Sequence, residues 1–247
     1  MRPLLPALLL LGLPGLCQAR TPKAAAPMVS SPTASALPLL APTTAPLTLP
    51  LIFERFEDID RGLKSLSADF RQFVRWDDSG LTQALEGSVE YRKPDLLRLE
   101  HRLPEAQTIV SDGLWLWMWR RATNQVIQTR LEDWRKSEPL AQGIMDFGNY
   151  AGLLRSYEVA LASSSPLPDG HRRVELLLTP RGKDKKSDFA LRLRLSTRDF
   201  FPADAELRVG QVLIHSLLEK VRLNPEIPEG RFRFSPPEGA DVFQNLR

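Results

Sequence analysis

The sequence contains a single cysteine, Cys17, and only three histidines, His101, His171 and His215. Cys17 lies in an apolar N-terminal stretch that we expect to be removed. The mature chain is therefore predicted to have no disulfide and no thiolate metal site. The histidines are isolated from one another in segments with the pattern of strands. We predict no metal, no cofactor and no histidine-based catalytic centre.

Clustered charge of one sign is also missing. The 33 Lys and Arg residues against 30 Asp and Glu leave a formal net charge of +3, and the two signs are interleaved along the chain. Nucleic-acid-binding proteins concentrate positive charge on one face, so we expect no nucleic-acid partner. Beyond the N-terminal stretch, no apolar run approaches the length of a membrane-spanning helix.

Familiar catalytic and nucleotide-binding motifs are absent as well. The sequence has no Gly-x-Ser-x-Gly, no His-Glu-x-x-His, no phosphate-binding loop and no dinucleotide fingerprint. Ser111-Asp112-Gly113 includes a possible nucleophile, but a tight turn between two strands explains this triplet fully. We therefore predict no catalytic residues and a protein that is not an enzyme, with a hydrolase as the least favoured alternative.

The first 19 residues have the pattern of a secretion signal. Arg2 is the charged end, residues 4–16 are apolar, and Cys17-Gln18-Ala19 offers a cleavage site. We predict cleavage near Ala19 and an exported, soluble chain. The alternative is lipid attachment at Cys17, although Leu16 stands where such sites carry a small residue.

Two further segments follow the signal. Residues 20–50 are rich in Pro, Ala, Ser and Thr and nearly free of charge, which predicts a disordered tether. Residues 51–247 are predicted to form one folded domain. Its first apolar residues recur at steps of three and four from Ile52 to Leu66, as in a helix whose apolar face lies on a sheet.

Most of the predicted domain alternates between apolar and polar residues, as half-buried strands do. Clear examples are residues 85–92, 97–102 and 189–195. We predict a mainly β fold, an antiparallel sheet that curls into a barrel or half-barrel. Small helices at residues 138–145 and 150–154 would lie on this sheet, and Phe232 with Phe234 would form a last strand.

One predicted strand, residues 114–119, is apolar on both faces because Trp115, Trp117 and Trp119 alternate with leucine and methionine. Such a strand needs cover on both sides; the core supplies one, and a ligand could supply the other. A sixteen-carbon acyl chain gains on the order of 12 kcal/mol when it leaves water. A lipid that crosses water therefore needs a soluble container, which a curved apolar sheet can provide.

Several segments, in order and spacing, are similar to those of one protein family. They are Phe70-Arg71-Gln72, Glu86-Gly87-Ser88-Val89, residues 92–100, Ile109-Val110-Ser111-Asp112-Gly113 and residues 232–239. Over residues 52–242 the chain resembles the LolA family of periplasmic outer-membrane lipoprotein carriers. The resemblance implies an unclosed eleven-stranded barrel with a helical lid and an apolar cavity for lipoprotein acyl chains. It also implies delivery from an inner-membrane ABC-type lipoprotein-releasing complex to an outer-membrane acceptor.

The resemblance directs attention to particular residues. We predict a lipid-binding cavity lined by strand and lid residues: Leu97, Leu99, Trp115, Trp117, Leu140, Ile144 and Met145. The family's functional arginine directly precedes the proline and pins the lid. Lys93 holds that place here, with Arg92 beside it as the alternative. Strand alternation turns Lys93 inward, where carbonyl groups that end a lid helix would be suitable acceptors.

Two other functions stay open at this stage. The long tether is unusual for the family and favours a shuttle for a different acylated lipid. A lipid-sensing regulatory module of the cell envelope is the alternative of another kind. In each case we expect a monomer in the periplasm.

Overall fold

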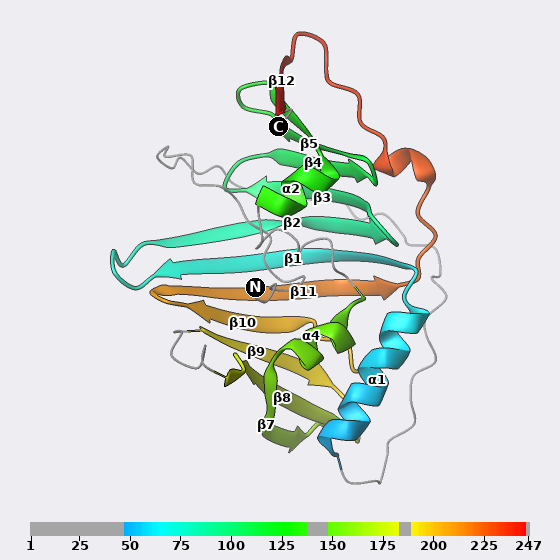
Figure 1. Ribbon diagram of the computed structural model, residues 1–247, viewed down its shortest axis with the longest axis vertical. Helices are drawn as coiled ribbons and strands as arrows, with labels where there is room; N and C mark the ends of the chain where they lie inside the picture. The colour runs from blue at the N-terminus through cyan, green and yellow to red at the C-terminus, as the bar shows by residue number, and fades with distance from the viewer. Residues whose placement is uncertain (1–46, 138–147, 183–188, 246–247) are drawn as a thin grey trace.

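The computed structural model describes residues 47–137, 148–182 and 189–245 of the chain. One twelve-stranded sheet dominates it, in the order β12-β6-β5-β4-β3-β2-β1-β11-β10-β9-β8-β7 (Figure 1). The first strands are β1 (Ser65–Trp76), β2 (Thr82–Arg92), β3 (Leu96–Leu103), β4 (Gln107–Asp112), β5 (Trp115–Arg120) and β6 (Gln125–Arg130). The others are β7 (Glu158–Pro166), β8 (Arg172–Thr179), β9 (Phe189–Ser196), β10 (Asp204–Val209), β11 (Val212–Leu223) and β12 (Asp241–Asn245).

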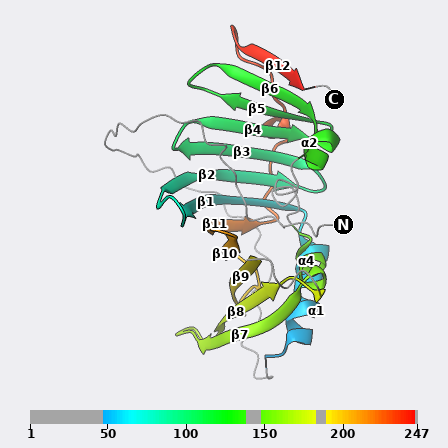
Figure 2. The ribbon, with the colours of Figure 1, turned by 60° about the vertical axis from the view of Figure 1, so that its left-hand side comes forward.

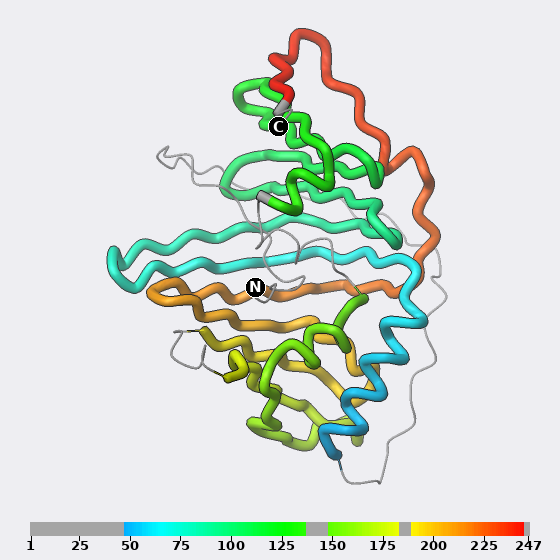
Figure 3. Tube along the Cα trace, viewed as in Figure 1, coloured from blue at the N-terminus to red at the C-terminus, as the bar shows by residue number. Residues whose placement is uncertain are grey.

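The sheet is open because β7 and β12 stand at opposite ends of the strand order. Eleven strands pair antiparallel, and β12 joins the edge of β6 in parallel. The mainly β, unclosed architecture predicted from the sequence is confirmed, with twelve strands rather than the eleven that the family resemblance implied. At the centre, β1 pairs with β11, so segments far apart in the chain lie side by side (Figure 3).

Three α-helices of the described ranges lie on one side of the sheet: α1 (Leu49–Gly62), α2 (Leu131–Ser137) and α4 (Tyr150–Ser156) (Figure 2). Thr48 caps the start of helix α1, because its hydroxyl accepts the Leu51 N–H, and Pro50 occupies the first turn. No helix in these ranges is long and apolar enough to cross a membrane.

One apolar core connects the helices to the sheet. It contains Ile52, Phe56 and Ile59 of α1, buried residues of α4, and alternate residues of nearly every strand. We call the sheet face that carries Phe70 and Leu97 the inner face, because it shares this core with α1 and α4. The opposite face is the outer face.

The structure corrects several predicted elements. Phe232 and Phe234 do not form a strand: Phe232 ends the short 3-10 helix η2 (Glu229–Phe232), and the last strand is β12. Prolines on both sides of this segment remove backbone donors, and its two phenylalanines pack on the sheet instead of pairing with it. Helix α2 was not predicted, and the helix expected at residues 138–145 lies outside the described residues.

Candidate functional site

The inner face of β3 and its neighbours carries the apolar residues predicted to meet a lipid. Leu97 and Leu99 are 0% and 1% exposed, and they alternate with the outward-facing Arg98. Across the sheet they pair with Tyr91 and Val89 of β2, which are also buried. The two leucines therefore lie in the middle of a continuous apolar surface, closed to solvent in this structure.

Strand β5 turns its tryptophans the other way. Leu116 and Met118 belong to the inner-face core, so Trp115, Trp117 and Trp119 point to the outer face. There the Phe234 ring lies over Trp117 and Trp119, at centroid distances of 6.1 and 6.4 Å. The outer face of β5 is thus covered by the segment of the same chain that contains Phe234, and the inner face by the core. Trp115 and Trp117 do not belong with Leu97 in one cavity, which corrects that part of the prediction.

The predicted lid residues Leu140, Ile144 and Met145 lie outside the described residues. What the structure does describe of this region is α4, which buries Tyr150, Ala151, Leu153 and Leu154. The Tyr150 ring packs edge-on against Phe56 of α1 and Phe201. Helix α4 is therefore joined to α1 and to the β9–β10 connection by aromatic contacts.

Lys93 follows β2 directly, and its ammonium group reaches the end of α1. Its Nζ donates to the carbonyl oxygen of Asp60 at 2.5 Å. This carbonyl belongs to the last turn of the helix, where such groups lack intrahelical partners and a positive charge is favourable. Gly148 lies against the same side chain, because a Cβ there would be 2.7 Å from Lys93 Cε.

Asp60 holds a second helix with its side chain. Its carboxylate accepts the backbone N–H groups of Tyr150 and Ala151, at 2.8 and 2.7 Å, in the first turn of α4. Burial raises the pKa of Asp60, an effect that these two N–H groups and Lys93 oppose. One residue of α1 thus connects the end of α1, the start of α4 and the β2–β3 connection. Sequence reasoning missed Asp60, because it is one of many acidic residues on the polar side of α1.

Arg92, the alternative to Lys93, lies on the outer face. Its guanidinium is stacked 5.2 Å above the centre of the Phe232 ring. Nearby, Arg231 donates to Glu90, and Arg98 donates to the Arg231 carbonyl. Arg92 and Lys93 therefore serve opposite faces, and Arg92 helps to attach the C-terminal segment to the sheet.

The Ser111-Asp112-Gly113 triplet forms the turn that its sequence suggests. The Asp112 carboxylate accepts the N–H groups of Leu114 and Trp115, and Gly113 has a φ of 92°. Ser111 donates to the Asp95 carbonyl. Each polar group of the triplet therefore has a structural partner.

A separate pocket of about 510 Å³ lies between α1 and the edge strand β7. Phe53, Val159, Glu158 and Arg181 line it. It is seven strands away from β3 in the sheet, so it is not the predicted lipid cavity.

Comparison with known proteins explains this arrangement. A family model described as "Outer membrane lipoprotein carrier protein LolA" matches residues 61–206. The chain belongs to the LolA family. Its relatives include the outer-membrane lipoprotein carrier proteins of Halorhodospira halophila and Alkalilimnicola ehrlichii. The first is 31% identical over 193 residues, covering 77% of this chain and 85% of the relative. The second is 30% identical over 212 residues, covering 85% and 89%.

The fold of this LolA-family chain also occurs among solved structures. An uncharacterized conserved protein from Thermus thermophilus superimposes with a TM-score of 0.50 at 17% identity. The likeness covers 79% of this chain and 98% of that chain, and it shows the fold alone.

The family is described as a carrier and not as an enzyme class. Within the described ranges, His, Cys, Asp and Glu residues form no group of three or more that could hold a metal ion. The polar residues of the site in this LolA-family chain, Lys93 and Asp60, connect elements of the fold to one another.

Proposed function

We propose that this protein carries the acyl chains of lipoproteins, or of a related acylated lipid, between the inner and outer membranes. The observation that supports this most is the apolar inner face of an open sheet, with Leu97 and Leu99 at its centre, in a member of a carrier family. An acyl chain laid on this face would exchange water for aliphatic side chains. Each buried methylene would contribute about 0.8 kcal/mol.

Loading requires the helical cover to move, because the inner-face leucines are buried in this structure. The cover is held by few polar contacts. They include the bonds of Lys93 and of the Asp60 carboxylate, a bond from the Asn224 amide to the Gly62 carbonyl, and ion pairs of Arg155 with Glu57 and of Arg135 with Asp95. Exposed ion pairs contribute little, typically under about 1 kcal/mol. Opening also separates apolar side chains of α1 and α4 from the sheet, and acyl chains that take their place would offset this loss.

Lys93 is proposed as the lid switch. Its bond to the Asp60 carbonyl forms when α1 and the β2–β3 connection approach each other, and it would break when cargo separates them. Restoring this bond would favour release to the next acceptor. Lysine has three donors on a flexible stem and no planar fork, so an arginine could bind two carbonyl groups where lysine binds one.

The proposed location is the periplasm, with an inner-membrane ABC-type complex as donor and an outer-membrane protein as acceptor. Export would follow from the signal pattern of residues 1–19, which gives a mature chain that begins at Arg20. N-terminal sequencing of protein from the periplasm tests this. An acylated Cys17 at the N-terminus would instead indicate an anchored protein and contradict the shuttle.

Native mass spectrometry tests the carrier function directly. Protein purified from the periplasm without detergent should carry a bound mass that fragments into fatty acyl groups. The same protein stripped of lipid should take up a synthetic diacylated lipopeptide and release it to acceptor membranes. Protein that neither retains an acyl lipid nor binds the lipopeptide would contradict the proposal.

A further inference from the structure

Two polar side chains of the inner face are buried without partners. Gln72 of β1 is 0% exposed and His101 of β3 is 5% exposed. Neither the amide of Gln72 nor the two ring nitrogens of His101 find a hydrogen-bond partner among the described residues. Buried polar side chains are nearly always paired, so such groups need an explanation.

Gln72 lies between the buried residues Phe70 and Val74 of β1, whereas His101 stands where the buried apolar surface of β3 ends. Along β3, the inward-facing positions Leu97, Leu99 and His101 have exposed fractions of 0%, 1% and 5%, and the strand then ends at the exposed residues Arg102 and Leu103, after a shift in its register with β2. His101 is thus the last buried position before the rim of the sheet. A lipid with its tails on the leucines would have its polar linkage near this point.

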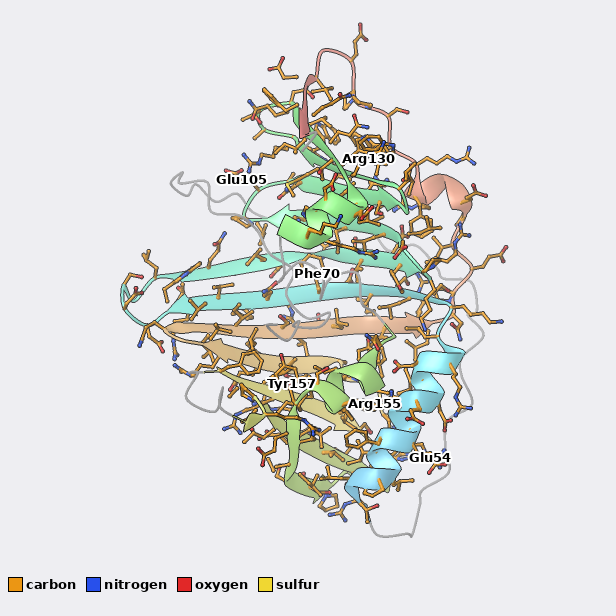
Figure 4. All side chains as sticks on the ribbon, in the orientation of Figure 1. Glu54, Phe70, Glu105, Arg130, Arg155 and Tyr157 are labelled. Atoms are coloured by element: carbon orange, nitrogen blue, oxygen red, sulfur yellow. The ribbon has the colours of Figure 1, made fainter. Side chains whose placement is uncertain are left out.

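Phe70 is the common neighbour of the two residues in the sheet: His101 lies across Gly87 from it, and Gln72 is two positions further along β1. Gly87 separates Phe70 from His101 in the sheet, and its missing side chain lets the Phe70 ring reach His101 edge-on, at a centroid distance of 5.4 Å. A Cβ on Gly87 would be 2.5 Å from that ring. Gln72 is the next inward-facing position after Phe70, which is labelled at the middle of the sheet in Figure 4.

We propose that Gln72 and His101 form a subsite for the ester carbonyl groups of an acyl-glycerol cargo. This inference rests on the proposed carrier function and adds the part of the lipid that is recognised. The Gln72 amide and one imidazole N–H can each donate a hydrogen bond to a carbonyl oxygen. An ester carbonyl is an uncharged acceptor, so it suits two neutral donors.

The chemistry favours a neutral ligand group. Burial lowers the pKa of His101 to about 4, so the ring is uncharged at neutral pH and keeps one N–H. A phosphate or carboxylate at this position would be a buried anion beside two neutral groups, which is costly. An ester carbonyl is the polar group that acyl-glycerol lipids carry directly beside their tails.

The experiment compares lipids that differ only in these carbonyl groups. The probes are a dipalmitoyl-glyceryl-cysteine peptide and its dihexadecyl ether counterpart, which has the same tails without carbonyls. A second pair, dipalmitoyl and dihexadecyl phosphatidylglycerol, distinguishes a lipoprotein from a phospholipid as the source of the ester. Affinities are measured by displacement of a fluorescent fatty acid from the full mature chain.

The wild type should bind the diester lipopeptide about tenfold more tightly than the diether. Gln72→Leu and His101→Leu should each reduce this ratio, and the double variant should bring it near one without weakening the diether. His101→Gln, which keeps a donor, should retain most of the ratio. Gln211→Leu, in an exposed turn, is the matched control and should behave as wild type.

The outcomes separate this inference from the carrier function. If diester and diether bind equally well to the wild type, or if the double variant keeps the preference, the subsite is wrong and the carrier stands. If neither lipid of either pair binds, the carrier function itself fails. A preference confined to the phosphatidylglycerol pair would keep the subsite and assign it to a phospholipid.

Discussion

The Nζ atom of Lys93 lies 2.5 Å from the carbonyl oxygen of Asp60, so one side chain beyond β2 holds the final turn of α1. The Asp60 carboxylate holds the first turn of α4 at the same time. Three segments that are distant in sequence therefore meet at one residue. This junction is where movement of the helical cover can be tested.

Lys93→Leu should leave lipid uptake intact and slow the transfer of lipid from loaded carrier to acceptor membranes by about 10- to 100-fold. A charged hydrogen bond would no longer form on closure. Lys93→Arg should transfer at least as fast as wild type. Lys64→Leu, a nearby exposed lysine, is the control. Equal transfer by wild type and Lys93→Leu would rule out the switch.

Asp60→Ala should loosen α4 without removing the backbone carbonyl that Lys93 uses. The Tyr150 and Ala151 amides would lose their acceptor, which costs about 1–3 kcal/mol of local stability. Hydrogen exchange should therefore accelerate at these two amides. Asp58→Ala, whose carboxylate bonds only Arg55 and Arg61 in the described structure, should leave them unchanged. Unaltered hydrogen exchange in Asp60→Ala would contradict the role of the Asp60 carboxylate as the acceptor of these two N–H groups.

Leu97→Glu should abolish binding of a fluorescent fatty acid, because an unpaired carboxylate would stand in the apolar surface. Leu97→Met, which conserves volume, should bind normally. Leu114→Glu is the matched control, since Leu114 is 58% exposed. Circular dichroism must show a folded Leu97→Glu variant. Wild-type affinity in that variant would remove the inner face of β3 from the proposed cavity.

Trp117→Ala and Phe234→Ala should both destabilise the protein and leave lipid affinity unchanged. The two rings pack against each other at a tilt of 32° on the outer face, so a double-mutant cycle in urea should give a coupling of about 0.5–1.5 kcal/mol. Loss of lipid binding in Trp117→Ala with a stable fold would return this residue to the binding site.

His101 should make stability depend on pH. Burial lowers its folded-state pKa to about 4, partly offset by Glu100, whereas the unfolded chain titrates near 6.5. Between these values only the unfolded state binds the proton, so stability is full above the window and is lost as pH falls through it. From pH 7.5 to pH 4.5, wild type should lose about 2–3 kcal/mol more than His101→Leu. Equal losses in urea melts would contradict the burial of this ring.

The strands were predictable because alternation depends only on neighbouring residues. Leu97 and Leu99 were assigned to one strand face from the sequence, and the structure has them on one face. The same rule failed at Phe232 and Phe234, where alternation arises from docking on the outer face instead of ladder pairing. Alternation of apolar and polar residues therefore shows that one side of a segment is buried, but it does not show that the segment pairs as a strand.

The orientation of β5 could not be predicted, because a strand that is apolar on both faces looks the same from either side. The tryptophans of β5 face outward because Phe234, far along the chain, covers them on that side. The role of Asp60 could not be predicted for a similar reason. Its partners in α4 are 90 and 91 positions away, and nothing local distinguishes it from its acidic neighbours.

The joining of β1 to β11 at the centre of the sheet has a consequence for how the chain reaches this structure. Arg71 and Glu219, which pair across this junction, are 148 positions apart. Contacts of such separation form slowly, because a long loop must close before they stabilise anything. Until residues 212–223 arrive, β1 presents an unpaired edge beside an apolar face, a combination that promotes aggregation. We therefore expect a newly made chain to gain from a holding chaperone until β11 completes the sheet.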